Sequence, residues 1–279
     1  MNTAAGAPPA VIAKAVRQLE AAQASRRPCA PVRDVLPAGD VDAAYAVQAA
    51  LIAHRTAGGA RIVGRKIGLT SPKVQAQLGV SQPDFGVLLD DMACAQDQPV
   101  DITRLIQPKI EAELAFILAA DLDRDPVTET DVAAATGYVV AALEIVDSRI
   151  AGWDISILDT VADNASCGLF VLGDQQVPLA STDVAAVRMT LHRDGDIVSA
   201  GTGADCLGSP LAAVAWLART VRRYGFPLRA EEVVLSGALG PMVNVEPGSR
   251  YTAAISGVGT VSAGFTRPAD LKTAAGTSS

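Results

Sequence analysis

Two glutamates that stand two positions apart are the side chains of this sequence best suited to hold a metal ion. In the segment 108–118, PKIEAELAFIL, Glu111 and Glu113 alternate with apolar residues. On a β-strand they share one face, with their α-carbons about 6–7 Å apart. Two carboxylates within an apolar strand repel each other and are costly to desolvate. A divalent cation would relieve both costs, whereas a solvated strand face would explain the same pattern without an ion.

A third glutamate stands in another apolar run. Glu144 lies within YVVAALEIVD at 138–147, and an isolated buried carboxylate is normally protonated or paired. Three glutamate oxygens suit a hard ion such as Mg²⁺, with positions left for water and a chelating substrate. Asp147 is an odd number of residues further on, so on a strand it points to the opposite face. We expect Asp147 to pair with Arg149 or to cap the chain that follows.

A lysine and an aspartate complete the set of candidate catalytic groups. Lys66 is flanked by Gly64 and Gly68, which allow another group to approach the backbone closely. A lysine near an open pocket can hold a developing enolate or transfer a proton, although most lysines are simply solvated. Arg65 alternates to the opposite face and is expected to be structural. Asp84 follows a proline and, by residue type alone, is typical of a turn.

Several other chemistries are excluded by what the sequence lacks. It contains no glycine-rich dinucleotide or phosphate loop and no Gly-x-Ser-x-Gly elbow. With only His54 and His192, a histidine metal site is nearly excluded and a Ser-His-Asp triad has little to draw on. The chemistry must rest on carboxylates, lysine, hydroxyls and backbone groups.

Hydrophobic spacing predicts the elements that position these groups. Helical spacing is found at 10–24, 41–57 and 209–223, and Asp40 is a plausible N-cap of the second helix. Asp194-Gly195 predicts a hairpin turn. Strands are expected near 61–68, 108–118, 138–147, 166–172, 187–193, 196–200, 232–236, 251–256 and 259–265. Helices first and strands later favour an α+β chain, with an N-terminal helical segment (1–60), a metal-binding catalytic β-rich core (61–267) and a flexible tail (268–279).

Composition limits the class of protein. The chain has 279 residues, 49% of them hydrophobic, and a formal net charge of −7. An acidic chain with 4% aromatic residues lacks the basic, stacking face that nucleic-acid binding needs. No apolar run approaches the roughly 20 residues of a membrane helix, and no signal peptide is recognisable. Four cysteines without a CxxC pair suit buried thiols in a reducing compartment, so we expect a cytoplasmic protein.

Five segments in a fixed order together resemble the hydratase and decarboxylase branch of the fumarylacetoacetase superfamily. They are GRKIGLTSPKVQAQLGVSQPDFGVL (64–88), PKIEAELAFIL (108–118), ALEIVDSRIAGWDISILDTVADNASCGLFVLG (142–173), LAAVAWLA (211–218) and VLSGALGPMVNVEPGSRY (234–251). The resemblance implies a mixed β-sandwich or β-roll core with an N-terminal helical part, and a homo-oligomer. Cys167 and Asn244 depart from the residues common in this branch, which puts only the fine shape of the pocket in doubt.

The resemblance also implies the residues of the site. A divalent metal, Mg²⁺ or Mn²⁺, would be held by an E-x-E pair and a later glutamate, which are Glu111, Glu113 and Glu144 here. The lysine of the K-I-G-L-T-S motif is Lys66 and the aspartate of P-D-F-G is Asp84. Ser166 matches a hydroxyl near the substrate carboxylate.

The activity implied is metal-dependent hydration by a hydro-lyase. The substrate would be 2-hydroxypenta-2,4-dienoate or a close analogue, and the product a 4-hydroxy-2-oxo acid, in the meta-cleavage degradation of aromatic compounds. Three alternatives stay open: a 4-oxalocrotonate-type decarboxylase on the same scaffold, a C–C bond hydrolase, and a catalytically silent partner subunit. The hydrolase is disfavoured because no histidine is placed to activate water, and the intact set of acidic residues argues against a silent subunit.

Overall fold

A computed structural model describes residues 7–71, 75, 82–96 and 98–267 of the chain. The helices are α1 (Pro9–Ser25), α2 (Val41–Ala57), α4 (Glu129–Ala135), α5 (Ile157–Ala162) and α6 (Pro210–Arg223). The strands are β1 (Ile62–Gly68), β2 (Asp84–Leu89), β3 (Ala93–Cys94), β4 (Pro108–Leu118), β5 (Thr136–Asp147), β6 (Cys167–Leu172), β7 (Arg188–Arg193), β8 (Asp196–Thr202), β9 (Val233–Leu235), β10 (Val243–Asn244), β11 (Arg250–Ile255) and β12 (Gly259–Gly264). The predicted α+β class, with helices at the N-terminus, is confirmed.

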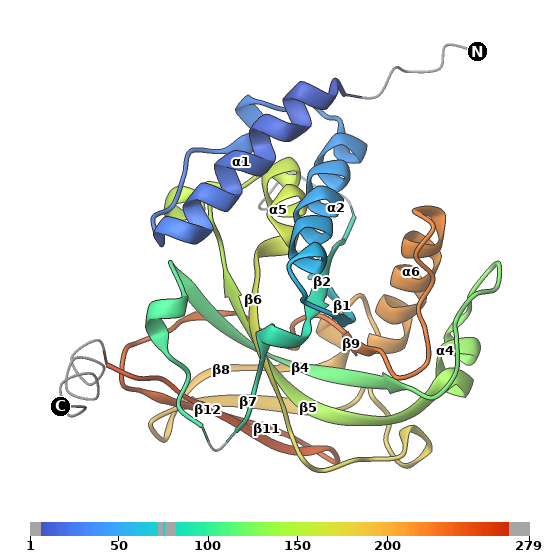
Figure 1. Ribbon diagram of the computed structural model, residues 1–279. Helices are drawn as coiled ribbons and strands as arrows, with labels where there is room; N and C mark the ends of the chain where they lie inside the picture. The colour runs from blue at the N-terminus through green and yellow to red at the C-terminus, as the bar shows by residue number, and fades with distance from the viewer. Residues whose placement is uncertain (1–6, 72–74, 76–81, 97, 268–279) are drawn as a thin grey trace.

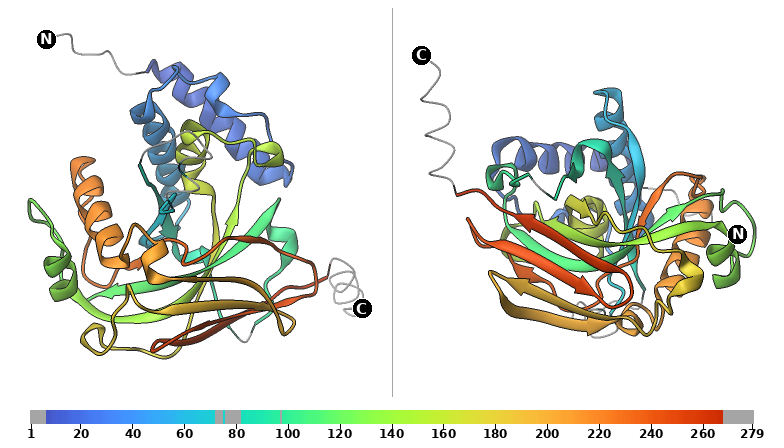
Figure 2. Two further views of the ribbon diagram at one scale, coloured as in Figure 1. Left: turned by 180° about the vertical axis from the view of Figure 1, so that it is seen from behind. Right: turned by 90° about the horizontal axis from the view of Figure 1, so that it is seen from below.

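Two sheets form the body of the molecule. An eight-stranded sheet has the order β2-β1-β9-β4-β5-β6-β3, with β10 paired to β4, and a four-stranded sheet has the order β12-β11-β7-β8. The larger sheet is mixed, because β1 pairs with β9 and β3 with β6 in parallel while the remaining pairs are antiparallel. Helices α1, α2 and α5 lie on one side of this sheet and the small sheet lies on the other (Figure 1). The views from behind and below show the same layers (Figure 2).

Strands β4 and β5 are the long central pair of the larger sheet. Every residue from Val139 to Asp147 of β5 is buried, as expected for a strand that is covered on both faces. The pair is antiparallel, and its register sets Glu111 directly opposite Glu144. The strands that bear the three glutamates are therefore held by the core of the fold.

The N-terminal helices are attached to the side of the sheet that carries the glutamates. Asp40 caps α2 as predicted, because its carboxylate accepts the Ala43 N–H at 2.9 Å. In the loop between α1 and α2, the backbone N–H of Arg33 donates to the Asp159 carboxylate at 2.9 Å. The Arg33 guanidinium donates to the same carboxylate at 2.8 Å. Asp159 also accepts the backbone N–H of Ser156, so this contact fixes the beginning of α5.

Other local predictions have mixed outcomes. The hairpin between β7 and β8 turns at Asp194 and Gly195, which have φ of 52° and 101°, as the Asp-Gly pair predicts. The expectation that Asp84 is a turn residue is wrong: it begins β2, because its backbone pairs with Gly68 of β1. Strands β2, β3 and β10 and helices α4 and α5 were not predicted. Within the described residues, no helix has the length and apolar character needed to span a membrane.

Candidate functional site

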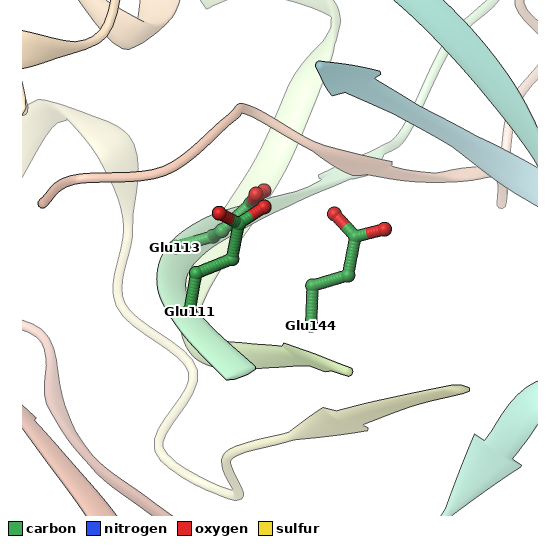
Figure 3. Close-up of side chains that lie close together, drawn as sticks. All are labelled: Glu111, Glu113 and Glu144. Carbon is green, nitrogen blue, oxygen red and sulfur yellow. The ribbon is translucent and has the colours of Figure 1, made fainter. Parts of the chain in front are cut away.

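The three glutamates converge, as their spacing predicts. Glu111 and Glu113 project from the same face of β4, and Glu144 projects from β5 beside them (Figure 3). One carboxylate oxygen from each lies within 4.8 Å of the others. Opposite ligands of an octahedral Mg²⁺ are about 4 Å apart, so small rotations of these side chains would suffice to bind one ion.

The glutamates lie inside the protein. Glu113 and Glu144 are fully buried and Glu111 is half-buried, so the interpretation of this strand face as solvated is wrong. Burial, followed by the neighbouring Glu144 carboxylate, raises the pKa of Glu111 to about 7 and raises the pKa of Glu113 well above its usual range. Burial also raises the pKa of Glu144, although Lys66 opposes the rise. Without a counter-charge, the folded protein disfavours the ionised form of all three.

Lys66 supplies one positive charge to this cluster. Its Nζ lies 3.0 Å from Oε1 of Glu144, and both side chains are almost completely buried. Burial by itself lowers the pKa of Lys66, but the carboxylates of Glu144 and Asp84 outweigh burial and raise it above its usual value. The two carboxylates therefore favour the protonated form of Lys66, and because its side chain is buried, the expectation that it could be a solvated surface lysine is wrong.

Asp84 stands next to Lys66 because two glycines make room. In the β1–β2 register, Lys66 is opposite Gly86 and Asp84 is opposite Gly68. A Cβ on Gly68 would lie 2.2 Å from Oδ1 of Asp84 and 3.6 Å from Nζ of Lys66. Burial raises the pKa of Asp84, while Lys66 and a hydrogen bond from Thr160 lower it. The glycine that sequence analysis noted for close approach is thus where the two candidate catalytic side chains meet.

Ser166 is presented by a left-handed turn. Asn164, Ala165 and Ser166 have φ of 54°, 52° and 53°, a conformation that costs of order 1–3 kcal/mol for each non-glycine residue. The turn is held by the Asn164 side chain, which accepts the Val87 N–H at 2.8 Å and donates to the Val87 carbonyl at 2.9 Å. A Cβ on Gly86 would lie 2.5 Å from the Asn164 carbonyl oxygen. Strained backbone that is held this firmly is characteristic of functional sites.

Unsatisfied polar atoms point to the same residues. Among the described residues, the buried side-chain oxygens without a hydrogen-bond partner are Oδ1 of Asp84, Oε1 of Glu113, both carboxylate oxygens of Glu144 and Oγ of Ser166. Only one of them, Oε1 of Glu144, has the Lys66 ammonium beside it. Buried polar groups in folded proteins are normally bonded. All of these atoms belong to four of the predicted site residues. They would be satisfied by a ligand that carries positive charge and hydrogen-bonding groups.

The structure corrects the predicted partners of Asp147. Its carboxylate accepts the backbone N–H groups of Ile106 and Gln107 at 2.6–2.9 Å, so it caps the chain that enters β4 rather than the chain that follows it. Arg149 forms its ion pair with Asp163 instead. The expectation that Arg65 is structural agrees with its position: its guanidinium is buried 3.6 Å from the Glu232 carboxylate.

Sequence analysis missed two residues that donate hydrogen bonds to carboxylates of the site. The backbone N–H of Gly237 donates to Oε2 of Glu113 at 2.8 Å, and Gly237 has a φ of 105° that favours glycine. The Thr160 hydroxyl donates to Oδ2 of Asp84 at 2.9 Å. The glycines of SGALG, which follows β9, could have indicated the role of Gly237. Nothing in the sequence indicates that Thr160 contacts a residue on another element.

A cavity of about 410 Å³ lies apart from this cluster. Its walls come from α1, α2, the beginning of β6 and the segments around Asp91 and Arg104, and they include Asp147, Arg149 and Asp163. None of the six predicted site residues lines it. The unsatisfied oxygens and the converging glutamates, rather than this cavity, therefore define the candidate site.

The donor set fits a hard divalent cation. Three glutamates and Asp84 share one ammonium group, so ionisation of all four carboxyl groups would leave a surplus of negative charge in this site. Oxygen donors of this kind are those preferred by Mg²⁺, Ca²⁺ and Mn²⁺. Glu111, Glu113 and Glu144 would hold the ion, and Lys66 and Asp84 would lie beside it.

Comparison with known proteins identifies relatives over most of the chain. Residues 61–266 match the family model described as fumarylacetoacetate (FAA) hydrolase C-terminal. A 2-keto-4-pentenoate hydratase of Burkholderia vietnamiensis is 54% identical over 255 residues, which are 91% of this chain and 97% of the relative. A 2-hydroxyhexa-2,4-dienoate hydratase of Comamonas testosteroni is 46% identical over 252 residues, or 90% of this chain and 96% of the relative.

A solved structure shows the same fold. The 4-oxalocrotonate decarboxylase of Pseudomonas putida G7, complexed with magnesium and adipate, superposes with a TM-score of 0.88 at 34% identity. The match covers 92% of this chain and 97% of that chain. The same enzyme has also been solved with calcium and acetate. The expected mixed β-sandwich or β-roll core with N-terminal helices is confirmed by this likeness.

Proposed function

Because the chain belongs to the fumarylacetoacetate hydrolase family, we propose that it is a 2-keto-4-pentenoate hydratase, a hydro-lyase that adds water to 2-hydroxypenta-2,4-dienoate or a close analogue. The observation that carries the proposal is the buried group of three glutamates with Lys66 and Asp84 beside it. Relatives named as hydratases share 46–54% identity with almost the whole chain. The reaction belongs to the degradation of aromatic compounds by meta-cleavage.

The resident ion is proposed to be Mg²⁺ or Mn²⁺. It would be held by Glu111, Glu113 and Glu144, whose unsatisfied oxygens and raised pKa values support an ionic ligand. Bound there, the ion would act as a Lewis acid toward the substrate carboxylate and 2-oxygen and stabilise enolate charge. The Gly237 N–H keeps one Glu113 oxygen occupied, so the other oxygen, which has no partner, would be left for the ion.

Lys66 acts at the 2-oxygen of the substrate. The dienol loses its O2 proton and gains a proton at C5, which gives the conjugated 2-oxo-3-enoate. The negative charge that develops on the 2-oxygen in this step is stabilised by a neighbouring ammonium group. Since Glu144 and Asp84 favour the protonated form of Lys66, it serves as a hydrogen-bond donor to the 2-oxygen rather than as a base.

Asp84 acts on water. Water adds to C4 of the 2-oxo-3-enoate and C3 gains a proton, so that one water molecule is consumed and a 4-hydroxy-2-oxo acid results. Oδ1 of Asp84 is buried without a partner, and its raised pKa makes this carboxylate a better base than an exposed one. It would orient the water molecule or remove its proton. Ser166, whose Oγ is also unsatisfied, would donate to the substrate carboxylate.

A panel of 2-hydroxydienoates with and without a terminal carboxylate tests this proposal. We expect the wild-type enzyme to remove the ultraviolet absorbance of 2-hydroxypenta-2,4-dienoate when Mg²⁺ is present, without release of CO₂. Release of CO₂ from a substrate with a terminal carboxylate, at a higher kcat/KM than hydration, would favour the decarboxylase alternative. Absence of turnover on every member of the panel would favour a silent partner subunit.

Assembly and location complete the proposal. We propose a homo-oligomer in the cytoplasm, as the family resemblance and the four free cysteines support. Light scattering of the purified protein measures the number of subunits, and a mass equal to that of one chain would contradict the proposed oligomer.

A further inference from the structure

The carboxylate of Asp84 has two oxygens in very different surroundings. Oδ2 accepts a hydrogen bond from the Thr160 hydroxyl at 2.9 Å, whereas Oδ1 has no partner. Both residues are buried, with exposed fractions of 1% for Asp84 and 4% for Thr160. A carboxylate that is held at one oxygen cannot rotate freely, so the direction of the other oxygen is fixed.

The free oxygen and Nζ of Lys66 lie near the same glycine of β1. A Cβ added to Gly68 would lie 2.2 Å from Oδ1 of Asp84 and 3.6 Å from Nζ of Lys66, so both atoms lie over the same glycine. Rotation of the carboxylate would replace Oδ1 with the oxygen that Thr160 occupies. A donated hydrogen bond stabilises the charged form of an oxygen and reduces its tendency to accept another proton.

We propose that Thr160 is a positioning residue that occupies Oδ2 of Asp84 and thereby reserves Oδ1 for proton transfer with substrate water. The proposal rests on the hydratase function proposed above. Among the described residues, no hydrogen bond joins Thr160 to the glutamates or to Lys66, so its hydroxyl reaches the site through Asp84.

A buried amide keeps the two residues at bonding distance. Nε2 of Gln48 on α2 donates to the carbonyl of Phe85 at 2.9 Å and to the carbonyl of Val161 at 3.0 Å. Phe85 follows Asp84 on β2, and Val161 follows Thr160 on α5. Gln48 therefore joins the backbone of the strand to the backbone of the helix one residue beyond the Asp84–Thr160 contact. This gives the N-terminal helix α2 a direct part in the geometry of Asp84.

Two substitutions at Thr160 separate its hydroxyl from its bulk. Thr160→Val keeps the shape and a similar helix propensity but removes the donor, whereas Thr160→Ser keeps the donor. We expect Thr160→Val to lower kcat about tenfold to a hundredfold, the loss typical when a group that orients a functional side chain is removed. KM for the dienoate and the Mg²⁺ affinity from calorimetry should stay at wild-type values. Thr160→Ser should restore kcat to within about threefold of wild type.

A matched control is available on another helix. The Thr220 hydroxyl donates within its own helix α6, to the Trp216 carbonyl at 2.9 Å, and has no bond to Asp84. Thr220→Val should leave kcat unchanged. Gln48→Met, which removes both amide donors at similar volume, should lower kcat in the same direction as Thr160→Val.

Four results would overturn the proposal. Wild-type kcat in Thr160→Val would show that the hydroxyl is not used, and an equal loss in Thr160→Ser would assign the effect to packing. A loss of Mg²⁺ affinity together with kcat would mean that Thr160 supports the whole site. A crystal structure of Thr160→Val in which the Asp84 carboxylate keeps its orientation would also contradict the positioning role. This last measurement needs no turnover, so it remains decisive if the wild-type protein hydrates no dienoate and the proposed function fails.

Discussion

The ammonium nitrogen of Lys66 lies 3.0 Å from Oε1 of Glu144 inside the protein. One side chain is a candidate catalytic group and the other a candidate metal ligand, so the ion pair couples the two halves of the site. A buried charge pair is strongly destabilised when one partner is removed. A cation bound by the glutamates would compete with Lys66 for Glu144, which makes metal affinity and the charge at position 66 interdependent.

Glu113→Gln tests the metal ligands. The substitution removes one charged ligand and keeps the volume, so we expect Mg²⁺-dependent turnover to be abolished and Mg²⁺ affinity in calorimetry to fall. Because burial disfavours the ionised Glu113, the melting temperature in chelator should be no lower than that of wild type. Glu20→Gln on α1, where the carboxylate contacts His54 of α2, is the control. Unchanged turnover of Glu113→Gln at saturating Mg²⁺ would contradict the assignment.

Lys66→Met tests the role of the ammonium group. Loss of such a donor beside developing negative charge typically lowers kcat by about 10²–10³. Mg²⁺ binding should persist, and should tighten, because a competing positive charge has left Glu144. Both quantities are measured on one preparation by calorimetry and steady-state kinetics. A kcat near that of wild type would defeat the catalytic role, and lost Mg²⁺ affinity would indicate a collapsed site.

The metal-free protein should lose stability as the pH rises. Glu111 has a folded-state pKa of about 7 and Asp163 of about 6, both raised chiefly by burial. For an acid whose pKa is raised on folding, the folded state binds more protons than the unfolded state, so stability falls as pH increases between the unfolded and folded pKa values. In chelator, the melting temperature should therefore be lower at pH 8 than at pH 5.5.

Saturating Mg²⁺ provides the contrast for this pH series. An ion held by the ionised glutamates stabilises the folded state by mass action and should reduce the loss at pH 8. If the melting temperature in chelator rises between pH 5.5 and 8, the glutamates are not buried together as described.

Asp147→Asn should act on stability and spare the chemistry. The carboxylate accepts two backbone N–H groups, from Ile106 and Gln107, and the amide of asparagine would turn a donor toward at least one of them. An unsatisfied buried donor costs about 1–3 kcal/mol, which thermal unfolding can detect. Removal of Mg²⁺ affinity at an unchanged melting temperature would mean that Asp147 belongs to the metal site.

The parts of the fold that carry a strong local pattern were predictable. Strand β4 and helix α2 have the predicted bounds, because alternation and helical spacing with an N-cap are encoded within each segment. Strand β2 was not predicted, since the partners of its backbone are β1 and the side chains of Gln48 and Asn164, which lie elsewhere in the sequence. The division of the chain at residue 60 and the flexible tail stay predictions, and the tail lies outside the described residues.

The candidate site also has parts that the sequence predicts and a part that it does not. The shared face of Glu111 and Glu113 follows from their spacing alone, and the approach of Glu144 needed only the pairing of two adjacent strands. The contact between Thr160 and Asp84 joins residues 76 positions apart on a helix and a strand. No local pattern encodes such a contact, so only the folded structure could reveal it.

The most direct test of the account is product identification by NMR with purified wild-type protein and 2-hydroxypenta-2,4-dienoate. In Mg²⁺ we predict conversion to 4-hydroxy-2-oxopentanoate, which should stop when a chelator is added and resume when Mg²⁺ is restored in excess. Undiminished conversion in chelator would contradict the role of the three glutamates as metal ligands. Unchanged substrate in both Mg²⁺ and Mn²⁺ would contradict the proposed hydratase function itself.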